Sequence, residues 1–160
     1  MVNKMIPEKV PQLIQHSVSG LYITPMFRKN EDVELRLWRY GAASEEEENV
    51  QWVFEPVNGQ DRVVQIRNRK YDRYITLSKP SANTAVTYTH PSGAGAPAQC
   101  WRLISPDTAQ ADFVIASMLD NQLVICPKEG RQEGETTLEV EQFGPWTDQF
   151  WRWRTPRGKK

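Results

Sequence analysis

Tryptophan recurs at an almost constant interval in this chain, at Trp52, Trp101 and Trp151. Each tryptophan begins a short apolar segment that ends at a proline: WVFEP, WRLISP and WRWRTP. A proline ends a strand because it has no backbone N–H to donate to a β-ladder. The last two copies read Gln-x-Trp, whereas the first has Val50 in place of the glutamine. A repeat of about fifty residues predicts that three similar units pack into one structure.

A second set of anchors keeps the same phase. Three apolar residues stand eight positions before an early Tyr or Leu of each copy: Ile14, Ile66 and Ile115, before Tyr22, Tyr74 and Leu123. Two short β-type runs surround a small polar turn there, and an alternating run follows, VELRLWRY, TAVTYTH or TTLEVEQF. Alternation of apolar and polar residues is typical of a half-buried strand. Each unit thus supplies about four short strands, and none can bury its apolar face alone.

Composition and the distribution of reactive residues exclude several classes of function. Positive and negative side chains balance at 20 each, so a nucleic-acid partner is not expected. No segment is long and apolar enough to span a membrane. The absence of a secretory signal and the presence of only Cys100 and Cys126 favour a cytoplasmic protein with free thiols. His16 and His90 lie in different repeats without a ligand cluster, so we expect no enzyme, no metal and no cofactor.

The phased tryptophans, the two Gln-x-Trp motifs and the strand VELRLW resemble the ricin B-type β-trefoil family over residues 12–156. The resemblance implies an all-β β-trefoil of three pseudo-repeats, each of about four strands. Residues 1–11 are then an N-terminal arm, and residues 157–160 a mobile tail. In this family the repeated tryptophans belong to the core and the glutamine supports local hydrogen bonds, so we expect all three indoles to be buried.

Carbohydrate binding is the first function that the resemblance implies. Lectins of this family bind sugar with one repeat at a time, through an Asp after the early Tyr-Ile pair, an aromatic residue ending the third strand, and an Asn before Gln-x-Trp. The first repeat keeps two of these features, Trp38 and Asn49. Glu34, Arg36 and Trp38 share one face of their strand, opposite Leu35 and Leu37. We therefore expect a site for a glycan or glycoprotein formed by Trp38, Arg36, Asn49 and Tyr40, unless a neighbouring loop covers Trp38.

The other repeats match the family pattern less well. The three positions that correspond to the family Asp are Thr24, Thr76 and Ile125. The aromatic position is Thr89 in the second repeat and Glu141 in the third, and the amide position is Ala98 and Asp148, respectively. No repeat keeps the carboxylate at its expected place, so any sugar site must differ from the usual galactose geometry.

Two alternatives to sugar binding remain open. A rigid exposed loop of a β-trefoil can enter a protease cleft, and Arg28 and Lys29 in the loop after Pro25 are the preferred candidates for such an inhibitory contact. The missing family Asp also fits a lectin-like accessory subunit that binds a protein without binding sugar. The sequence does not indicate an oligomeric state.

Overall fold

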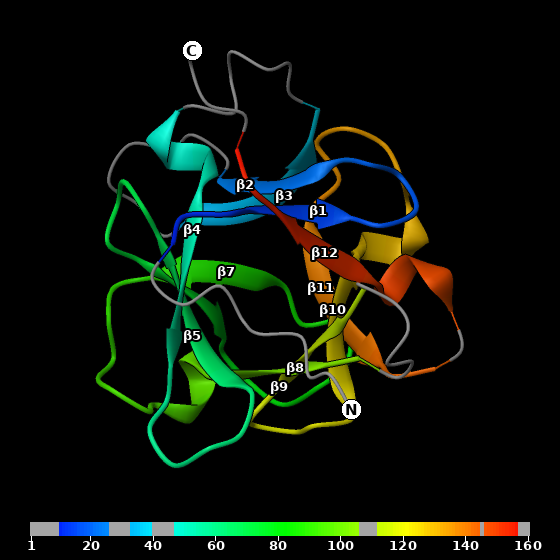
Figure 1. The fold of residues 1–160 in the computed structure, drawn as a ribbon. Coiled ribbons are helices and arrows are strands. Elements are labelled where there is room, and N and C mark those ends of the chain that lie inside the picture. Colours follow the sequence, from blue (N-terminus) through cyan, green and yellow to red (C-terminus); the bar gives the residue numbers. More distant parts are fainter. Residues whose placement is uncertain (1–9, 26–32, 40–46, 106–111, 145, 157–160) are drawn as a thin grey trace.

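The computed structural model of the chain describes residues 10–25, 33–39, 47–105, 112–144 and 146–156 (Figure 1). The first repeat contains β1 (Leu13–His16), β2 (Tyr22–Pro25), β3 (Val33–Trp38) and β4 (Trp52–Pro56). The second contains β5 (Val63–Asn68), β6 (Tyr74–Leu77), β7 (Val86–Thr89) and β8 (Trp101–Ile104). The third contains β9 (Val114–Ser117), β10 (Leu123–Pro127), β11 (Leu138–Gln142) and β12 (Trp151–Arg154). The predicted all-β architecture with four strands in each repeat is confirmed.

The described part of the chain also contains short 3-10 helices. One turn of 3-10 helix precedes the last strand of each repeat: η2 (Glu48–Val50), η3 (Pro97–Gln99) and η5 (Thr147–Gln149). A further turn, η4 (Lys128–Gly130), follows β10 in the third repeat. None of these described helices approaches the length of a membrane span.

The outer strands of the repeats close into a barrel. Neighbouring strands pair antiparallel as β1 with β12, β4 with β5, β5 with β8, and β8 with β9. Single bridges between Gln12 and Trp52 and between Phe113 and Trp151 join the remaining neighbours. Closure leaves these strands without a free edge, which removes a common route to aggregation.

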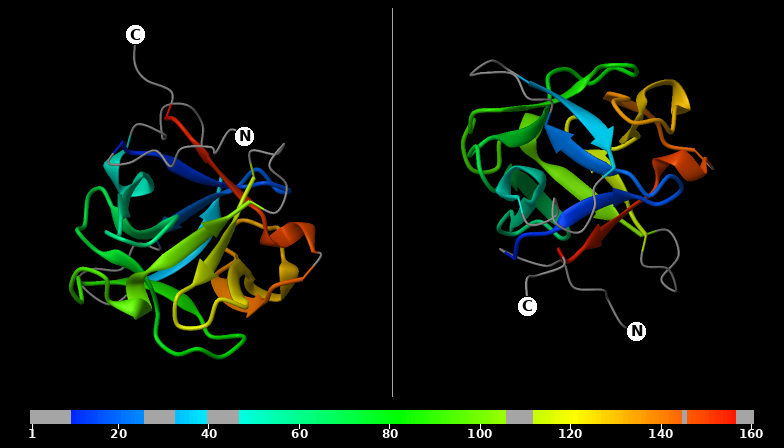
Figure 2. Two further views of the ribbon diagram at one scale, coloured as in Figure 1. Left: turned by 60° about the horizontal axis from the view of Figure 1, so that its bottom comes forward. Right: turned by 90° about the horizontal axis from the view of Figure 1, so that it is seen from above.

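The inner strands form three hairpins, β2–β3, β6–β7 and β10–β11, which also contact one another. Strand β3 pairs with β7, and β11 is bridged to both at Arg36–Thr137 and Ala85–Glu139. Figure 2 shows the three repeats arranged around a common centre. This closed barrel with three hairpins is the β-trefoil architecture.

The repeated indoles occupy equivalent buried places, as predicted. Trp52, Trp101 and Trp151 are all fully buried. Their Nε1 atoms donate to the carbonyl oxygens of Ile23, Ile75 and Ile125 at 3.0, 2.9 and 3.0 Å, respectively. A buried indole N–H needs one partner, and the same carbonyl satisfies it in each repeat. The threefold pseudo-symmetry therefore extends to individual hydrogen bonds.

The Gln-x-Trp glutamines close the loops that precede the 3-10 helices. Gln149 Nε2 donates to the Gln142 carbonyl at 2.8 Å, and its Oε1 accepts from the Gly144 N–H at 3.0 Å. Gln99 makes the equivalent bonds to the His90 carbonyl and the Ser92 N–H. The predicted local hydrogen-bonding role is thus confirmed. Val50 takes the position in the first repeat and packs instead with Leu13 and Tyr22.

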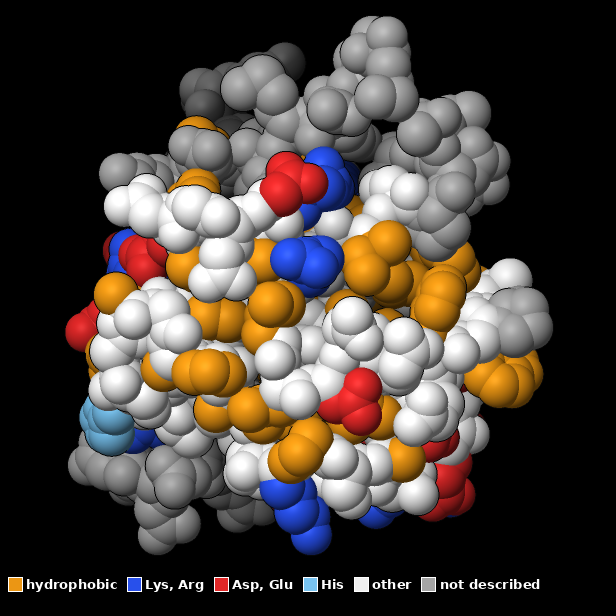
Figure 3. Space-filling view, turned by 90° about the horizontal axis from the view of Figure 1, so that it is seen from below, with side chains coloured by type: hydrophobic (Ala, Val, Ile, Leu, Met, Phe, Trp, Pro, Cys, Tyr) orange, Lys and Arg blue, Asp and Glu red, His pale blue; other side chains and the backbone are white. Residues whose placement is uncertain are grey.

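Hydrophobic side chains also reach the surface. Figure 3 shows several separate hydrophobic groups with neutral polar atoms between them on the face seen from below. Among the residues that the structure describes, the exposed large hydrophobic ones are Val10, Val18, Tyr71, Phe143 and Trp146. Single exposed apolar residues are normal on protein surfaces, so only those beside a pocket need a functional explanation.

Candidate functional site

The indole hydrogen bonds fix which residues are equivalent in the three repeats. Ile23, Ile75 and Ile125 accept the equivalent indole hydrogen bond, so they occupy equivalent positions. The residues that follow them, Thr24, Thr76 and Cys126, are therefore equivalent too. The prediction that Ile125 occupies the family Asp position is therefore wrong, and Cys126 occupies it. The third repeat has one more residue between Ile115 and its carbonyl acceptor than the other two repeats, which shifts the register by one. Ile125 itself points into the core.

Cross-strand pairing confirms the other assignments. Thr24 pairs with Arg36, Thr76 with Thr87, and Cys126 with Glu139. The residues two positions later on the same face are Trp38, Thr89 and Glu141, which are the predicted equivalents of the family aromatic residue. The amide positions fall in the 3-10 helices, at Asn49, Ala98 and Asp148. Each repeat thus brings its three positions to one side of a hairpin.

In the second repeat two of these positions, Thr76 and Thr89, form a closed polar network with Gln99. The Thr76 and Thr89 hydroxyls lie 2.8 Å apart, and Gln99 Nε2 lies 3.2 and 3.1 Å from them. The hydroxyl of Thr76 also donates to the Tyr74 carbonyl at 2.7 Å. Such a network satisfies its own donors and acceptors, so it offers little to a ligand.

In the first repeat, Trp38 is half-buried rather than fully exposed. The predicted faces of β3 are confirmed, since Leu35 and Leu37 are buried and Trp38 lies with Arg36 on the other face. The Arg36 guanidinium carbon lies 4.3 Å from the centre of the Trp38 ring, and Arg36 also pairs with Glu135 at 3.1 Å. Gly134 lies against the same ring: a Cβ added to this glycine would meet the ring at 3.7 Å, an ordinary van der Waals distance. Part of the ring that was expected to meet a sugar is therefore covered by its own protein.

Of the remaining predicted residues of the first repeat, the structure describes only Asn49. Asn49 is only 5% exposed, and its main-chain carbonyl accepts from Asn68 Nδ2 at 3.0 Å. Tyr40 and the inhibitory candidates Arg28 and Lys29 lie outside the described residues. The first-repeat site and the inhibitory loop therefore stay predictions.

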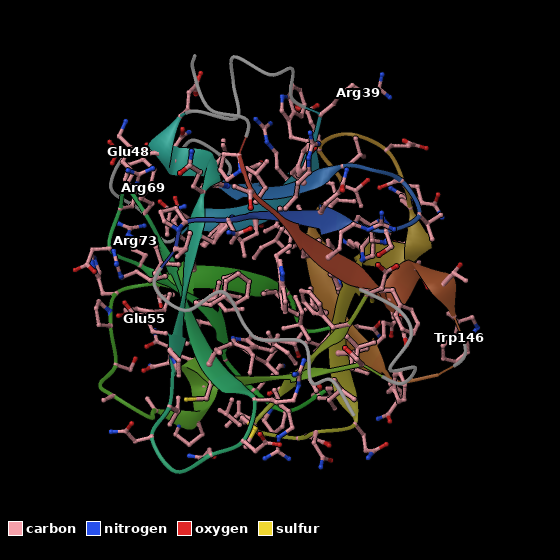
Figure 4. All side chains as sticks on the ribbon, viewed as in Figure 1. Arg39, Glu48, Glu55, Arg69, Arg73 and Trp146 are labelled. Atoms are coloured by element: carbon pink, nitrogen blue, oxygen red, sulfur yellow. The ribbon has the colours of Figure 1, made fainter. Side chains whose placement is uncertain are left out.

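The third repeat contains a pocket of about 310 Å³. Its lining includes all the repeat-equivalent positions of that repeat, together with residues of the neighbouring loops: Cys126, Glu129, Gly130, Glu141, Gln142, Trp146, Asp148 and Gln149. The side chain of Trp146 is 56% exposed and stands at the edge of the molecule (Figure 4). Aromatic and acidic side chains therefore meet at one opening.

The Trp146 ring is held against the backbone. It occupies the space that a side chain at Gly144 would need, because a Cβ built there overlaps the ring. Gly144 is itself held through the Gln149 side chain. The Gln-x-Trp motif of the third repeat therefore supports the loop on which this exposed indole stands.

Carboxylates also line the pocket. Asp148 lies close to Gly130, because a Cβ added to this glycine would lie only 3.3 Å from Asp148 Oδ2. Gly130 has a positive φ of 68°, a backbone conformation that favours glycine. Glu129 carries a salt bridge to Arg131 at 3.3 Å, with both side chains well exposed. Glu129 N–H donates to Glu139 Oε2 at 3.3 Å behind the pocket. The acidic groups thus come from η4, β11 and η5.

Burial and nearby carboxylates perturb two groups at or beside the pocket, Glu139 and Cys126. Burial raises the pKa of Glu139, the Glu129 N–H opposes this rise, and both the charge of Glu141 and a hydrogen bond to it reinforce the rise. Burial also raises the pKa of the Cys126 thiol, with contributions from Glu141, Asp148 and Glu139. One ligand atom from each of Cys126, Glu139 and Glu141 lies within 4.8 Å of the others, a spacing that would also admit a cation. The pocket is electrostatically negative.

The sequence favours the first repeat because only that repeat keeps two of the family residues, Trp38 and Asn49, at the family positions. The third repeat instead has Cys126 and Glu141 there, and its aromatic residue comes from the loop after β11. The signal in the sequence is Trp146 itself, a tryptophan outside the repeating set and within the turn-forming run Gly144-Pro145-Trp146. A tryptophan without a place in the core is a candidate contact residue.

No protein-family model and no curated protein matches the chain by sequence. Solved structures do resemble it. A Macrolepiota procera ricin B-like lectin in complex with lactose matches with a TM-score of 0.74 and 15% identity, over 96% of this chain and 100% of the lectin. The Rhizoctonia solani agglutinin matches with a TM-score of 0.72 and 14% identity, over 96% and 99% of the two chains. An exo-β-1,3-galactanase from Clostridium thermocellum matches with a TM-score of 0.75 and 15% identity, but this chain covers only 32% of it.

Proposed function

We propose that this chain, which has the ricin B-type β-trefoil fold, is a carbohydrate-binding protein without catalytic activity. Its principal site is the third-repeat pocket. The observation that carries the proposal is the coincidence of this pocket with the repeat-equivalent sugar positions, Cys126, Glu141 and Asp148. In the second repeat two of the equivalent positions, Thr76 and Thr89, are bound to each other and to Gln99 by hydrogen bonds.

The chemistry of the lining suits a sugar. An exposed indole can stack on the apolar face of a pyranose, and carboxylates can accept hydrogen bonds from its hydroxyls. Trp146 supplies the first feature, and Glu141 and Asp148 supply the second. Gln142 adds an amide at the rim. A volume of about 310 Å³ is at the lower end of ordinary small-ligand pockets and suits one or two sugar units.

The test is a glycan array followed by calorimetric titration of the best glycan with matched variants. We expect Trp146→Ala to weaken binding by about 10- to 100-fold, since removal of a central aromatic anchor typically costs 1–3 kcal/mol or more. Trp38→Ala is the matched control on the first repeat. Trp38→Ala should bind the glycan as tightly as the unmodified protein. If Trp38→Ala loses binding, the first-repeat site predicted at Trp38 and Arg36 is favoured instead.

Failure of carbohydrate binding has a clear signature. If no glycan binds the folded protein, the proposal is wrong. Capture of a specific protein by the same sample would then favour the alternative of a lectin-like accessory subunit. Inhibition of a protease, abolished by substitution of Arg28 or Lys29, would favour the inhibitor alternative.

A further inference from the structure

The third-repeat pocket has an unbalanced charge. Its lining contributes the carboxylates of Glu129, Glu141 and Asp148, and in the described part of the chain no lysine or arginine lines it. Glu139 is a buried carboxyl group hydrogen-bonded to Glu141, and the charge of the lining is that of Glu129, Glu141 and Asp148 alone. Neutral hydroxyls need acceptors, but they do not need this density of negative charge.

The neighbouring cations compensate only in part. Arg131 pairs with Glu129 in an exposed salt bridge, which solvent screens strongly. Lys128 acts on Glu139 at a distance and is exposed. Figure 4 shows Arg39, Arg69 and Arg73 well separated from Trp146 in the view. Glu141 and Asp148 therefore face the pocket without a cation in its lining.

An aromatic ring lies beside these carboxylates. Trp146 is the most exposed large hydrophobic residue described, and it lines the same opening as Glu141 and Asp148. A tryptophan ring attracts a cation to its face, and nearby carboxylates strengthen the attraction in a site that excludes part of the solvent. An ammonium group and an apolar sugar face can thus be bound by one set of residues.

We propose that this pocket selects glycans that carry free amino groups, such as de-N-acetylated hexosamine units, over their neutral N-acetylated counterparts. The inference rests on the proposed carbohydrate-binding function and specifies its ligand class. Asp148 and Glu141 accept charge-assisted hydrogen bonds from the ammonium group. Trp146 stacks on the ring of the same or the adjacent sugar unit. Uronic acids and other anionic sugars are rejected by the same carboxylates.

The experiment compares two ligands that differ only in acetylation, a β-1,4-linked glucosamine tetramer and the corresponding N-acetylglucosamine tetramer, by calorimetry near neutral pH. We expect the amino form to bind at least about tenfold more tightly, as is typical when a hydrogen bond gains charge assistance. Glu141→Gln and Asp148→Asn should each remove most of this preference while retaining the shape of the site. Glu133→Gln is the matched control, since it removes one exposed negative charge of the neighbouring loop that does not line the pocket. Circular dichroism establishes that each variant is folded.

The possible results separate the two proposals. Equal binding of both tetramers, with loss in Trp146→Ala, overturns the amino-sugar inference and leaves carbohydrate binding intact. Absence of binding to both tetramers and to every glycan of the array overturns both. Tetralysine that binds as tightly as the amino tetramer would show attraction to any polycation, and it also overturns the inference. Competition by millimolar calcium or zinc alone, with no effect of acetylation, would assign the carboxylates to a metal ion instead.

Discussion

At the scale of single residues, His16 connects the start of the barrel to the third-repeat site. It is fully buried, with Nδ1 2.8 Å from Ser19 Oγ and Nε2 2.8 Å from the Asp148 carbonyl oxygen. The Ser19 oxygen already accepts from the Leu21 N–H, so its own hydrogen is free to point at Nδ1. A carbonyl can only accept, so Nε2 carries the hydrogen. The geometry therefore suits a neutral imidazole that holds the backbone of η5.

This arrangement makes stability depend on pH. Burial lowers the pKa of His16, and the Asp148 carbonyl and carboxylate only partly oppose that effect. Below the ordinary histidine pKa of about 6.5, the unfolded chain binds a proton that the folded chain resists, so the free energy of unfolding falls as the pH falls from about 6.5 to the lower native pKa. Glu139, with its raised pKa, has the opposite sign, because its native form gains a proton first.

Urea unfolding between pH 8 and pH 5 measures the His16 contribution. We expect His16→Gln to be less stable at pH 8 and to lose the part of the pH dependence that lies below about 6.5. His90→Gln is the matched control, because it replaces the other histidine of the chain, which is exposed. An unaltered slope in His16→Gln would show that this imidazole does not titrate as we describe.

Residue types in the sequence were sufficient to predict the buried indoles and the two faces of β3. They were not sufficient to predict the environment of Trp38. Its cover includes Arg36 on its own strand and Gly134 on a loop almost a hundred residues later, and only the meeting of β3 with β11 brings that loop near. Exposure of a strand residue depends on such distant contacts, which alternation does not encode.

At the scale of elements, the loop between β11 and η5 determines whether the third repeat has a binding surface. Gln142 ends β11, Gly144 receives the Gln149 side chain, and Trp146 packs on Gly144 before η5 begins. A side chain at position 144 must displace the indole, because the two cannot occupy the same space. The position of Trp146 is therefore set by a residue that does not line the pocket.

Gly144→Ala tests this dependence. We expect glycan binding to fall to the level of Trp146→Ala, whereas the free energy of unfolding should change by less than about 0.5 kcal/mol, as for other surface substitutions. The emission of Trp146 should also shift, which gives a readout that needs no ligand. Gly134→Ala is the control, since its Cβ would meet the Trp38 ring at an ordinary 3.7 Å. Retained binding in Gly144→Ala would mean that the indole has another support.

The strands and their order along the chain followed from alternation and turn residues, but the register of the third repeat did not. Leu123 and Val124 are both apolar, so the sequence alone did not decide which of them matches Tyr22 and Tyr74. The structure decides it through the Trp151–Ile125 hydrogen bond. One residue of slip exchanges the core side of a strand for its outer side, and this is why Cys126 replaces Ile125 at the site.

At the scale of the whole molecule, the three repeats share one hydrophobic core. Its largest cluster joins residues of every repeat, including Ile14, Ile66 and Ile115. The fold was predictable because each repeat carries the same pattern of strands and core residues. A wrong assignment in one repeat can therefore be corrected by comparison with the other two. Function was less predictable because the repeats differ most in loops and hairpin ends, where each copy has its own residues.

A shared core predicts that the molecule unfolds as one unit, and Trp101→Phe tests this with a change in the repeat farthest in sequence from both termini. The variant loses the indole N–H and leaves the buried Ile75 carbonyl without its partner, which typically costs about 1–3 kcal/mol. Far-UV circular dichroism and tryptophan fluorescence in urea should give coincident transitions at a lower midpoint. Trp146→Phe should leave the midpoint unchanged, since that indole lies outside the core.

Ligand binding gives a second measure of the same cooperativity. Because the barrel closes only when β1 meets β12, the third-repeat pocket of Trp101→Phe should lose its ligand at the urea concentration at which the protein unfolds. A pocket that still binds its ligand after the second repeat has unfolded would show that the repeats fold independently.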